Sequence, residues 1–223
     1  MFAGHIGAAL VVGRAERRVN IGAFIVAALL LDLVLWLFVL LGWEAVSIPS
    51  NFSSTHQAQF VFPYSHGLLA SVIWSVAAGV VGFIAYQRLQ KARLRAAVLV
   101  AAAVFSHWLL DALVHAPEMP LVGAASPKVG FGLWQNIPAA LFAEAVIVLV
   151  GLCLYIPGAS LSRTKAVSLT TLSLLLLGFT AVGMTIAPPP PSAMAMAGSS
   201  LVTLIVVCVL AYWLGRLPNE GRA

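Results

Sequence analysis

Six apolar runs, each about 20 residues long, follow one another along the chain and limit what it can fold into. An α-helix of that length crosses a hydrocarbon core about 30 Å thick. Such a helix also pairs its backbone groups internally, as lipid requires. The sequence therefore predicts an all-α polytopic bundle with spans at residues 21–43, 66–87, 95–115, 135–157, 166–187 and 198–215.

Composition supports a membrane protein and excludes an ordinary soluble domain. Hydrophobic residues make up 61% of the 223 positions and charged residues only 9%, whereas soluble domains carry about 25% charged residues. The net charge is +5, but the twelve Lys and Arg fall between the apolar runs and form no continuous basic face. We therefore predict membrane lipid as a partner and no nucleic-acid partner.

The basic residues predict how the chain is oriented. They gather in alternate connections between the spans, and the connections 44–65, 116–134 and 188–197 hold only Lys128. Because basic loops stay on the cytoplasmic side of a membrane, we expect six spans and a cytoplasmic C-terminus. The other basic positions are Arg14, Arg17, Arg18, Arg88, Lys91, Arg93, Arg95, Arg163, Lys165, Arg216 and Arg222.

A further apolar segment at residues 2–13 is too short to cross the membrane. It precedes the first arginines, whereas a cleaved signal peptide begins with its basic residues. We expect a short helix that dips into the bilayer beside the first span, followed by a turn at 14–20. At about 1.5 Å per residue, His5 would then lie about 13 Å from the cytoplasmic face.

The chain contains only two aspartates, Asp32 and Asp111, and both lie inside apolar runs. A charge at the centre of a membrane helix costs at least about 2.5–3.5 kcal/mol on insertion scales, so such residues mark functional sites. The two buried carboxylates therefore require a metal ion, a proton or a cationic partner. His107 and His115 stand four residues before and after Asp111, which places all three on one helix face.

Other ionisable groups are predicted to lie at the same depth in the membrane as this helix face. Counted down from the outer ends of their helices, Asp32, Glu144 and His107 lie at about 16, 15 and 12 Å. His66 begins the second span at the same outer face, and Glu118 lies in an outer loop. Imidazole and carboxylate are usual ligands of Zn²⁺ and similar divalent ions. The pattern indicates a site for such an ion in the outer half of the bundle.

Each of these residues also has a simpler interpretation. Asp32 and Asp111 would serve equally as hydrogen-bond partners between helices. His66 and His115 lie near the interface, where a hydrated histidine is ordinary, and Glu118 would be solvated in its loop. Only the spatial arrangement decides between these roles.

The fifth and sixth spans contain no Asp, Glu, His, Lys or Arg. We therefore expect the site-bearing helices within residues 1–157, followed by two further transmembrane helices and a cytoplasmic tail within 158–223. Those two helices would pack the bundle, meet lipid or close a homo-oligomer. Their small residues, such as Gly178 and Ser199, would allow close helix approach.

Four pieces of the sequence carry a family resemblance: GHIG at 4–7, Asp32, YSHGLL at 64–69 and SHWLLD at 106–111. They resemble the YdjM-like family of bacterial inner-membrane proteins, described as membrane-bound metal-dependent hydrolases. LVHAPEMP at 113–120 and GFGLW at 130–134 are similar to a branch of small membrane proteins. The resemblance covers roughly residues 1–145. It implies a bacterial inner-membrane location, hydrolysis, and metal ligands drawn from His5, Asp32, His66, His107 and Asp111.

Our leading hypothesis is a membrane-embedded hydrolase that acts on a lipid or a lipid-linked ester or phosphodiester near the outer leaflet. A divalent ion, with Zn²⁺ favoured, would polarise the substrate, and Glu144 or Glu118 would act as general base. The alternatives are a transporter that uses the same cluster as a proton or metal-ion relay, and a non-catalytic scaffold with a structural metal site. The predicted ligands are His107, Asp111, Asp32 and His66, with His5 or His115 completing the set.

Overall fold

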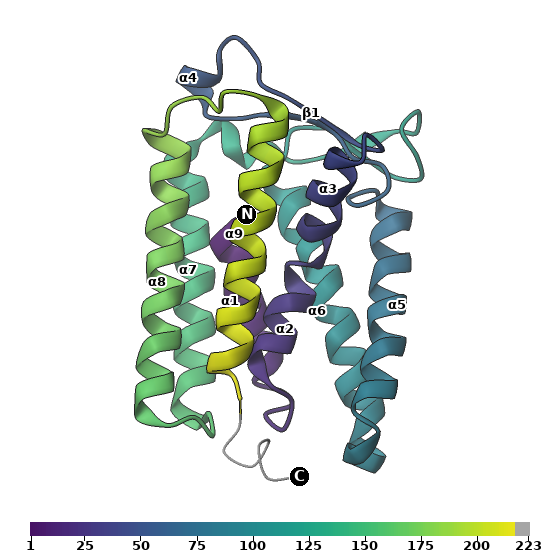
Figure 1. The fold of residues 1–223 in the computed structure, drawn as a ribbon, viewed down its shortest axis with the longest axis vertical. Coiled ribbons are helices and arrows are strands. Elements are labelled where there is room, and N and C mark those ends of the chain that lie inside the picture. The colour runs from purple at the N-terminus through teal and green to yellow at the C-terminus, as the bar shows by residue number, and fades with distance from the viewer. Residues whose placement is uncertain (217–223) are drawn as a thin grey trace.

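The chain folds into a bundle of upright helices that is capped at one end by loops and short strands (Figure 1). The computed structural model describes residues 1–216, and the remainder of the predicted tail, with Arg222, lies outside this range. The longer helices of the described chain are α1 (Phe2–Gly13), α2 (Ile21–Ala28), α3 (Leu30–Leu40), α5 (Leu68–Ala85), α6 (Arg93–Val114), α7 (Ile137–Tyr155), α8 (Arg163–Thr185) and α9 (Ala193–Leu214).

The two ends of the bundle differ in structure and charge. The loop end carries the short helix α4 (Phe52–Thr55) and two antiparallel hairpins, whereas the basic end carries the turns rich in Arg and Lys. The hairpins pair β1 (Ala45–Ser47) with β2 (Gln59–Val61) and β3 (Met119–Pro120) with β4 (Lys128–Val129). Single 3₁₀ segments lie at Gln87–Ala92, Leu133–Gln135 and Ile156–Gly158.

The predicted all-α membrane bundle is confirmed. Within residues 1–216, five helices are long and apolar enough to cross a membrane, and α2 with α3 passes the same test as one bent pair. This pair occupies the span predicted at 21–43, but the helix breaks at Leu29 and bends by 47°. No glycine or proline stands at this break, so no local signal marks it. The last span begins earlier than predicted, because the Ser192 hydroxyl caps it by accepting from the Ala195 backbone N–H.

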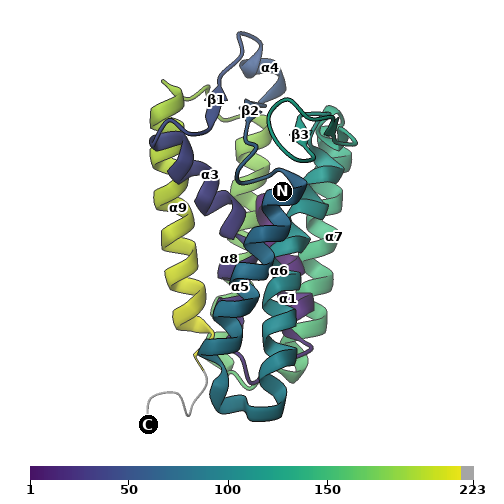
Figure 2. The ribbon, with the colours of Figure 1, turned by 90° about the vertical axis from the view of Figure 1, so that its right-hand side faces the viewer.

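The short helix α1 lies beside α2 of the first span, as predicted, and is enclosed within the bundle. It packs against α2, α6, α7 and α8, and its residues Ala3, His5 and Ala9 are fully buried. Both ribbon views place it among the other helices (Figure 1, Figure 2). A helix without a polar face is stable in this position because its neighbours cover most of its surface.

Two glycines allow α1 to touch α7. A Cβ atom on Gly7 would lie 2.6 Å from the carbonyl oxygen of Ile147, and one on Gly151 would lie 2.5 Å from the carbonyl oxygen of Gly7. The two backbones are therefore closer than any larger residue permits. This contact sets the height of α1, and the Gly4 N–H consequently donates to Glu144 Oε2 at 3.1 Å.

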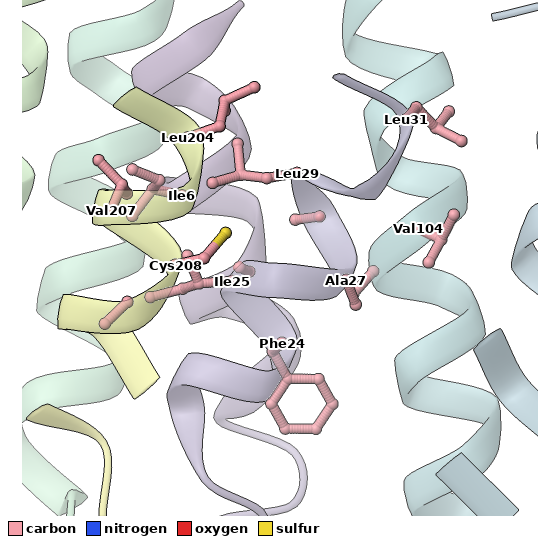
Figure 3. Packing of buried hydrophobic residues seen from close by; sticks show 14 of the residues in the cluster. Ile6, Phe24, Ile25, Ala27, Leu29, Leu31, Val104, Leu204, Val207 and Cys208 are labelled. Atoms are coloured by element: carbon pink, nitrogen blue, oxygen red, sulfur yellow. The ribbon is translucent and has the colours of Figure 1, made fainter. Parts of the chain in front are cut away.

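Apolar side chains hold the bend between α2 and α3 in place. Leu29 at the bend lies close to Ile6 of α1 and Leu204 of α9, while Ala27 faces Val104 of α6 (Figure 3). All five side chains are buried. Because close-packed interiors resist displacement, this packing fixes the direction in which α3 leaves the bend.

The hairpins bring aromatic side chains over the loop end of the bundle. Phe60 of β2 pairs with Val46 of β1. The ring centroid of Phe60 lies 5.7 Å from that of His115, and the ring centroid of Phe62 lies 4.9 Å from that of His66. These loops therefore form an apolar cover above two of the histidines.

We expect Gly151→Ala to destabilise the protein by about 1–3 kcal/mol, because the added methyl group meets backbone atoms of α1 that cannot move independently. The matched control is Gly178→Ala on α8, where nothing lies within 4 Å of the added Cβ. Alanine there should be neutral or stabilise the helix by up to about 1 kcal/mol. Thermal unfolding of both variants in detergent measures the difference. Equal melting temperatures would contradict the α1–α7 contact.

Candidate metal centre

Six side chains that the sequence predicts as metal ligands meet inside the bundle. They come from α1, α3, α6 and the segments that flank α5 and α6. Five of the six are almost completely buried, and the carboxylate from the first turn of α3 is one-fifth exposed. The six are His5, Asp32, His66, His107, Asp111 and His115.

Asp111 occupies the middle of this cluster. Its Oδ2 atom lies 3.2 Å from His107 Nε2 and 3.3 Å from His66 Nε2. His115 Nε2 is 3.7 Å from the same oxygen. Asp32 Oδ1 lies 3.6 Å and 3.7 Å from the Nε2 atoms of His66 and His107. Three imidazoles therefore converge on one oxygen atom of Asp111, and a second carboxylate lies against two of these imidazoles.

The other oxygen of Asp111 faces α1. Asp111 Oδ1 lies 3.1 Å from His5 Nε2 and accepts a hydrogen bond of 2.9 Å from the α-amino group of Met1. Glu144 of α7 lies on the same side of α1, held by the Gly4 N–H. Its Oε1 atom is buried without a hydrogen-bond partner.

The bend in the first span orients His107. Its Nδ1 atom is 2.6 Å from the carbonyl oxygen of Ala28, the last residue of α2. Because a carbonyl oxygen only accepts hydrogen bonds, Nδ1 carries the proton and Nε2 presents a lone pair. The break at Leu29 thus positions a carbonyl behind the imidazole, and it also sets Asp32 in the first turn of α3 in front of it.

A relay through Ser65 and Glu44 orients His66. Glu44 accepts the Ser65 hydroxyl at 2.7 Å, and the backbone N–H groups of Tyr64 and Ser65 also donate to it. With its proton committed, Ser65 Oγ accepts from His66 Nδ1 at 2.8 Å, which leaves Nε2 as a lone pair. Burial raises the pKa of the Glu44 carboxyl, while these hydrogen bonds oppose that rise.

Sequence reasoning missed Glu44 as a member of the site. The carboxylate stands just outside the first span and is 5% exposed. Its partner Ser65 is 21 residues away, and the contact exists only because the β1–β2 hairpin folds the intervening loop back. The one available signal was an acidic residue at the end of an apolar run.

Glu118 orients His115 in the same manner. Its Oε1 atom lies 2.6 Å from His115 Nδ1, and its Oε2 atom accepts from the backbone N–H of Phe60 at 3.2 Å. The Trp134 ring packs against His115, with the centroids 4.3 Å apart. His115 therefore also directs Nε2 towards Asp111. His56, which directly follows the short helix α4, takes part in none of the ion pairs found among residues 1–216.

The resulting arrangement is suited to a cation. His66 Nε2 and His107 Nε2 lie 3.1 Å apart and the nearby carboxylate oxygens only accept, so either one of these nitrogens carries a proton or a metal ion lies among them. Acceptors this close repel one another unless a positive centre lies among them. The ligand atoms of His66, His107 and Asp111 lie within 4.8 Å of one another, as do those of His5, Asp32 and His107. The donor set suits Zn²⁺ or a similar divalent ion.

A cavity of about 520 Å³ adjoins the cluster. Asp111, His66 and Glu144 line one part of it, and residues of α8 and α9 line another part. The last two spans thus form a wall of the cavity without contributing an ionisable side chain, a role that sequence reasoning did not predict. The α8 and α9 residues in the wall are Phe179, Thr180, Gly183, Met184, Met196, Ser199, Ser200, Thr203 and Leu204.

Comparisons with known proteins yielded no relative: no family model, no curated protein and no solved structure matches the chain significantly. The geometry defines an integral membrane protein whose buried His and Asp side chains are able to hold a metal ion.

We expect Glu44→Gln to weaken divalent-metal binding about 10–100-fold, the usual effect of removing a partner of a metal ligand. The glutamine amide donates to Ser65 Oγ, so the Ser65 proton turns towards His66 Nδ1 and the ring proton moves to Nε2. Competition with a chromophoric chelator measures the affinity, and ¹⁵N chemical shifts of the imidazole report the tautomer.

The matched control for this change is Glu16→Gln. Glu16 is another buried carboxylate, but it lies at the basic end and pairs with Arg18 at 2.7 Å. Its replacement should leave the metal affinity unchanged. Wild-type affinity in Glu44→Gln would contradict the relay.

Proposed function

We propose that this protein is a membrane-embedded metal-dependent hydrolase that acts on a lipid or a lipid-linked ester or phosphodiester. The observation that carries the proposal is the position of the cluster of acceptors, which lines a cavity with both polar and apolar walls. A bound divalent ion would polarise a phosphoryl or carbonyl oxygen and lower the pKa of a water molecule. The ligands would be His66, His107, Asp111 and Asp32, with His5 or His115 in addition.

Glu144 is the better suited of the two predicted general bases. Its Oε1 atom is buried, has no hydrogen-bond partner among residues 1–216 and belongs to a side chain that lines the cavity. The Gly4 N–H holds the other oxygen, so the carboxylate is oriented while one oxygen remains available for a proton. Both Glu118 oxygens already accept hydrogen bonds, which favours a role in orienting His115.

The cavity wall favours a substrate with a hydrocarbon chain. Phe179 lines the cavity and is also 57% exposed on the apolar outer surface of α8. The cavity therefore meets the face that lipid would cover. Phe2, Met196 and Leu204 extend the apolar lining inwards, and Thr180 and Thr203 add hydroxyl groups. A chain lying along this wall would place a polar head group beside Asp111.

A transport function receives less support from the arrangement. An ion relay requires further acidic or histidine side chains beyond the cluster. Between the cluster and the basic end, the described helices offer none until Glu16, which is paired with Arg18. A purely structural metal site would not need the adjoining cavity. Membership of the YdjM-like family agrees with hydrolysis and is part of the proposal.

The test is an assay of purified protein with fluorescent lipid phosphodiesters and esters. We expect hydrolysis that a chelator abolishes and that Zn²⁺ or Mn²⁺ restores. Glu144→Gln should lower kcat about 10²–10⁴-fold, as the loss of a general base does, with KM and metal content little changed. His56→Gln, which alters a histidine outside the cluster, should match the wild type.

Three results would contradict the proposal. Hydrolysis that is insensitive to chelation would show that the reaction needs no metal. An unchanged kcat in Glu144→Gln would show that Glu144 is not the general base. Metal-loaded protein that hydrolyses none of the lipids but accumulates the ion inside sealed vesicles would be a transporter.

A further inference from the structure

The carboxylate of Asp111 has two differently occupied sides. Oδ2 faces His66 and His107 at 3.3 Å and 3.2 Å, whereas Oδ1 faces His5 at 3.1 Å. A carboxylate approached by imidazoles at both oxygens is arranged to bridge two positive centres rather than to bind one.

The orientation of two imidazole rings also argues against one shared ion. The rings of His5 and His107 are stacked, with centroids 3.7 Å apart and planes within 7° of parallel. The lone pair of an imidazole nitrogen lies in the ring plane. An ion in the plane of His107 therefore lies outside the plane of His5 by about the stacking distance. The two rings consequently direct their lone pairs at separate positions, each beside one oxygen of Asp111.

The second position, beside Asp111 Oδ1, has His5 as an available ligand. Both ring nitrogens of His5 are buried without a hydrogen bond of good geometry. The ligand atoms of His5 and Asp32 lie within 4.8 Å of each other, so a second carboxylate is in reach. The α-amino group of Met1, 2.9 Å from Asp111 Oδ1, already places a positive charge against this oxygen.

We propose that the centre holds two divalent cations bridged by Asp111. His66, His107 and Asp111 Oδ2 bind the first, and His5, Asp32 and Asp111 Oδ1 bind the second. The 3.7 Å between the stacked rings agrees with the spacing of about 3.5–4 Å in two-metal sites. The proposal rests on the metal site of the proposed function and extends it. Two-metal sites serve hydrolysis of phosphoesters in particular, which favours a phosphate-bearing lipid as the substrate class.

The test counts ions and measures their coupling. Detergent-purified protein is loaded with Mn²⁺, freed of excess metal, and examined by plasma mass spectrometry and electron paramagnetic resonance. We expect two ions per chain and an exchange-coupled spectrum in the wild type. His5→Ala should retain one ion and show the spectrum of isolated Mn²⁺. Asp32→Asn provides a second variant with the same expectation and leaves the α1 packing untouched.

The matched control is His56→Ala, which should retain both ions and the coupled spectrum. One uncoupled ion in the wild type, unchanged in His5→Ala, would overturn the proposal and leave the Met1 amino group as the second positive charge. In that event lipid hydrolysis by the protein with one ion would still support the proposed function. Protein that binds no ion would overturn both proposals.

Discussion

Repulsion among hydrogen-bond acceptors is the constraint on which the site and the bundle around it depend. The Nε2 atoms of His66, His107 and His115 lie within 4 Å of Asp111 Oδ2, and the Asp32 carboxylate lies within 4 Å of the first two of these nitrogens. In a buried space of low dielectric, such groups drive their helices apart unless positive charge lies among them. Metal binding and the assembly of α1, α3 and α6 are therefore expected to be coupled.

Much of the irregular structure holds these imidazoles in place. The bend at Leu29 presents the Ala28 carbonyl to His107, the first hairpin brings Glu44 to Ser65, and the loop after α6 presents Glu118 to His115. Each partner fixes a proton on Nδ1 and leaves Nε2 as a lone pair. Departures from straight helices are thus concentrated where an imidazole requires a partner.

The spans and the central residues could be predicted from the sequence, because hydropathy reports length and the helix rise is constant. From the helix rise alone, Asp32 and His107 were predicted to lie at similar depths in the membrane. The bend at Leu29 could not be predicted, since tertiary packing and no local residue holds it. Glu44 was missed because its contact depends on a hairpin pairing. The cavity wall of α8 and α9 was missed because, in a sequence, an apolar residue that contacts lipid cannot be told from one that lines a cavity.

The length of α1 explains where the cavity lies. Twelve residues extend about 18 Å, whereas a full crossing needs about 30 Å, so α1 is shorter by about two helical turns. Met1 and Phe2 at its tip form part of the cavity lining. The cavity therefore lies beyond the tip of α1, which acts as its floor. The first residues of α1 therefore set the depth of the cavity within the bundle.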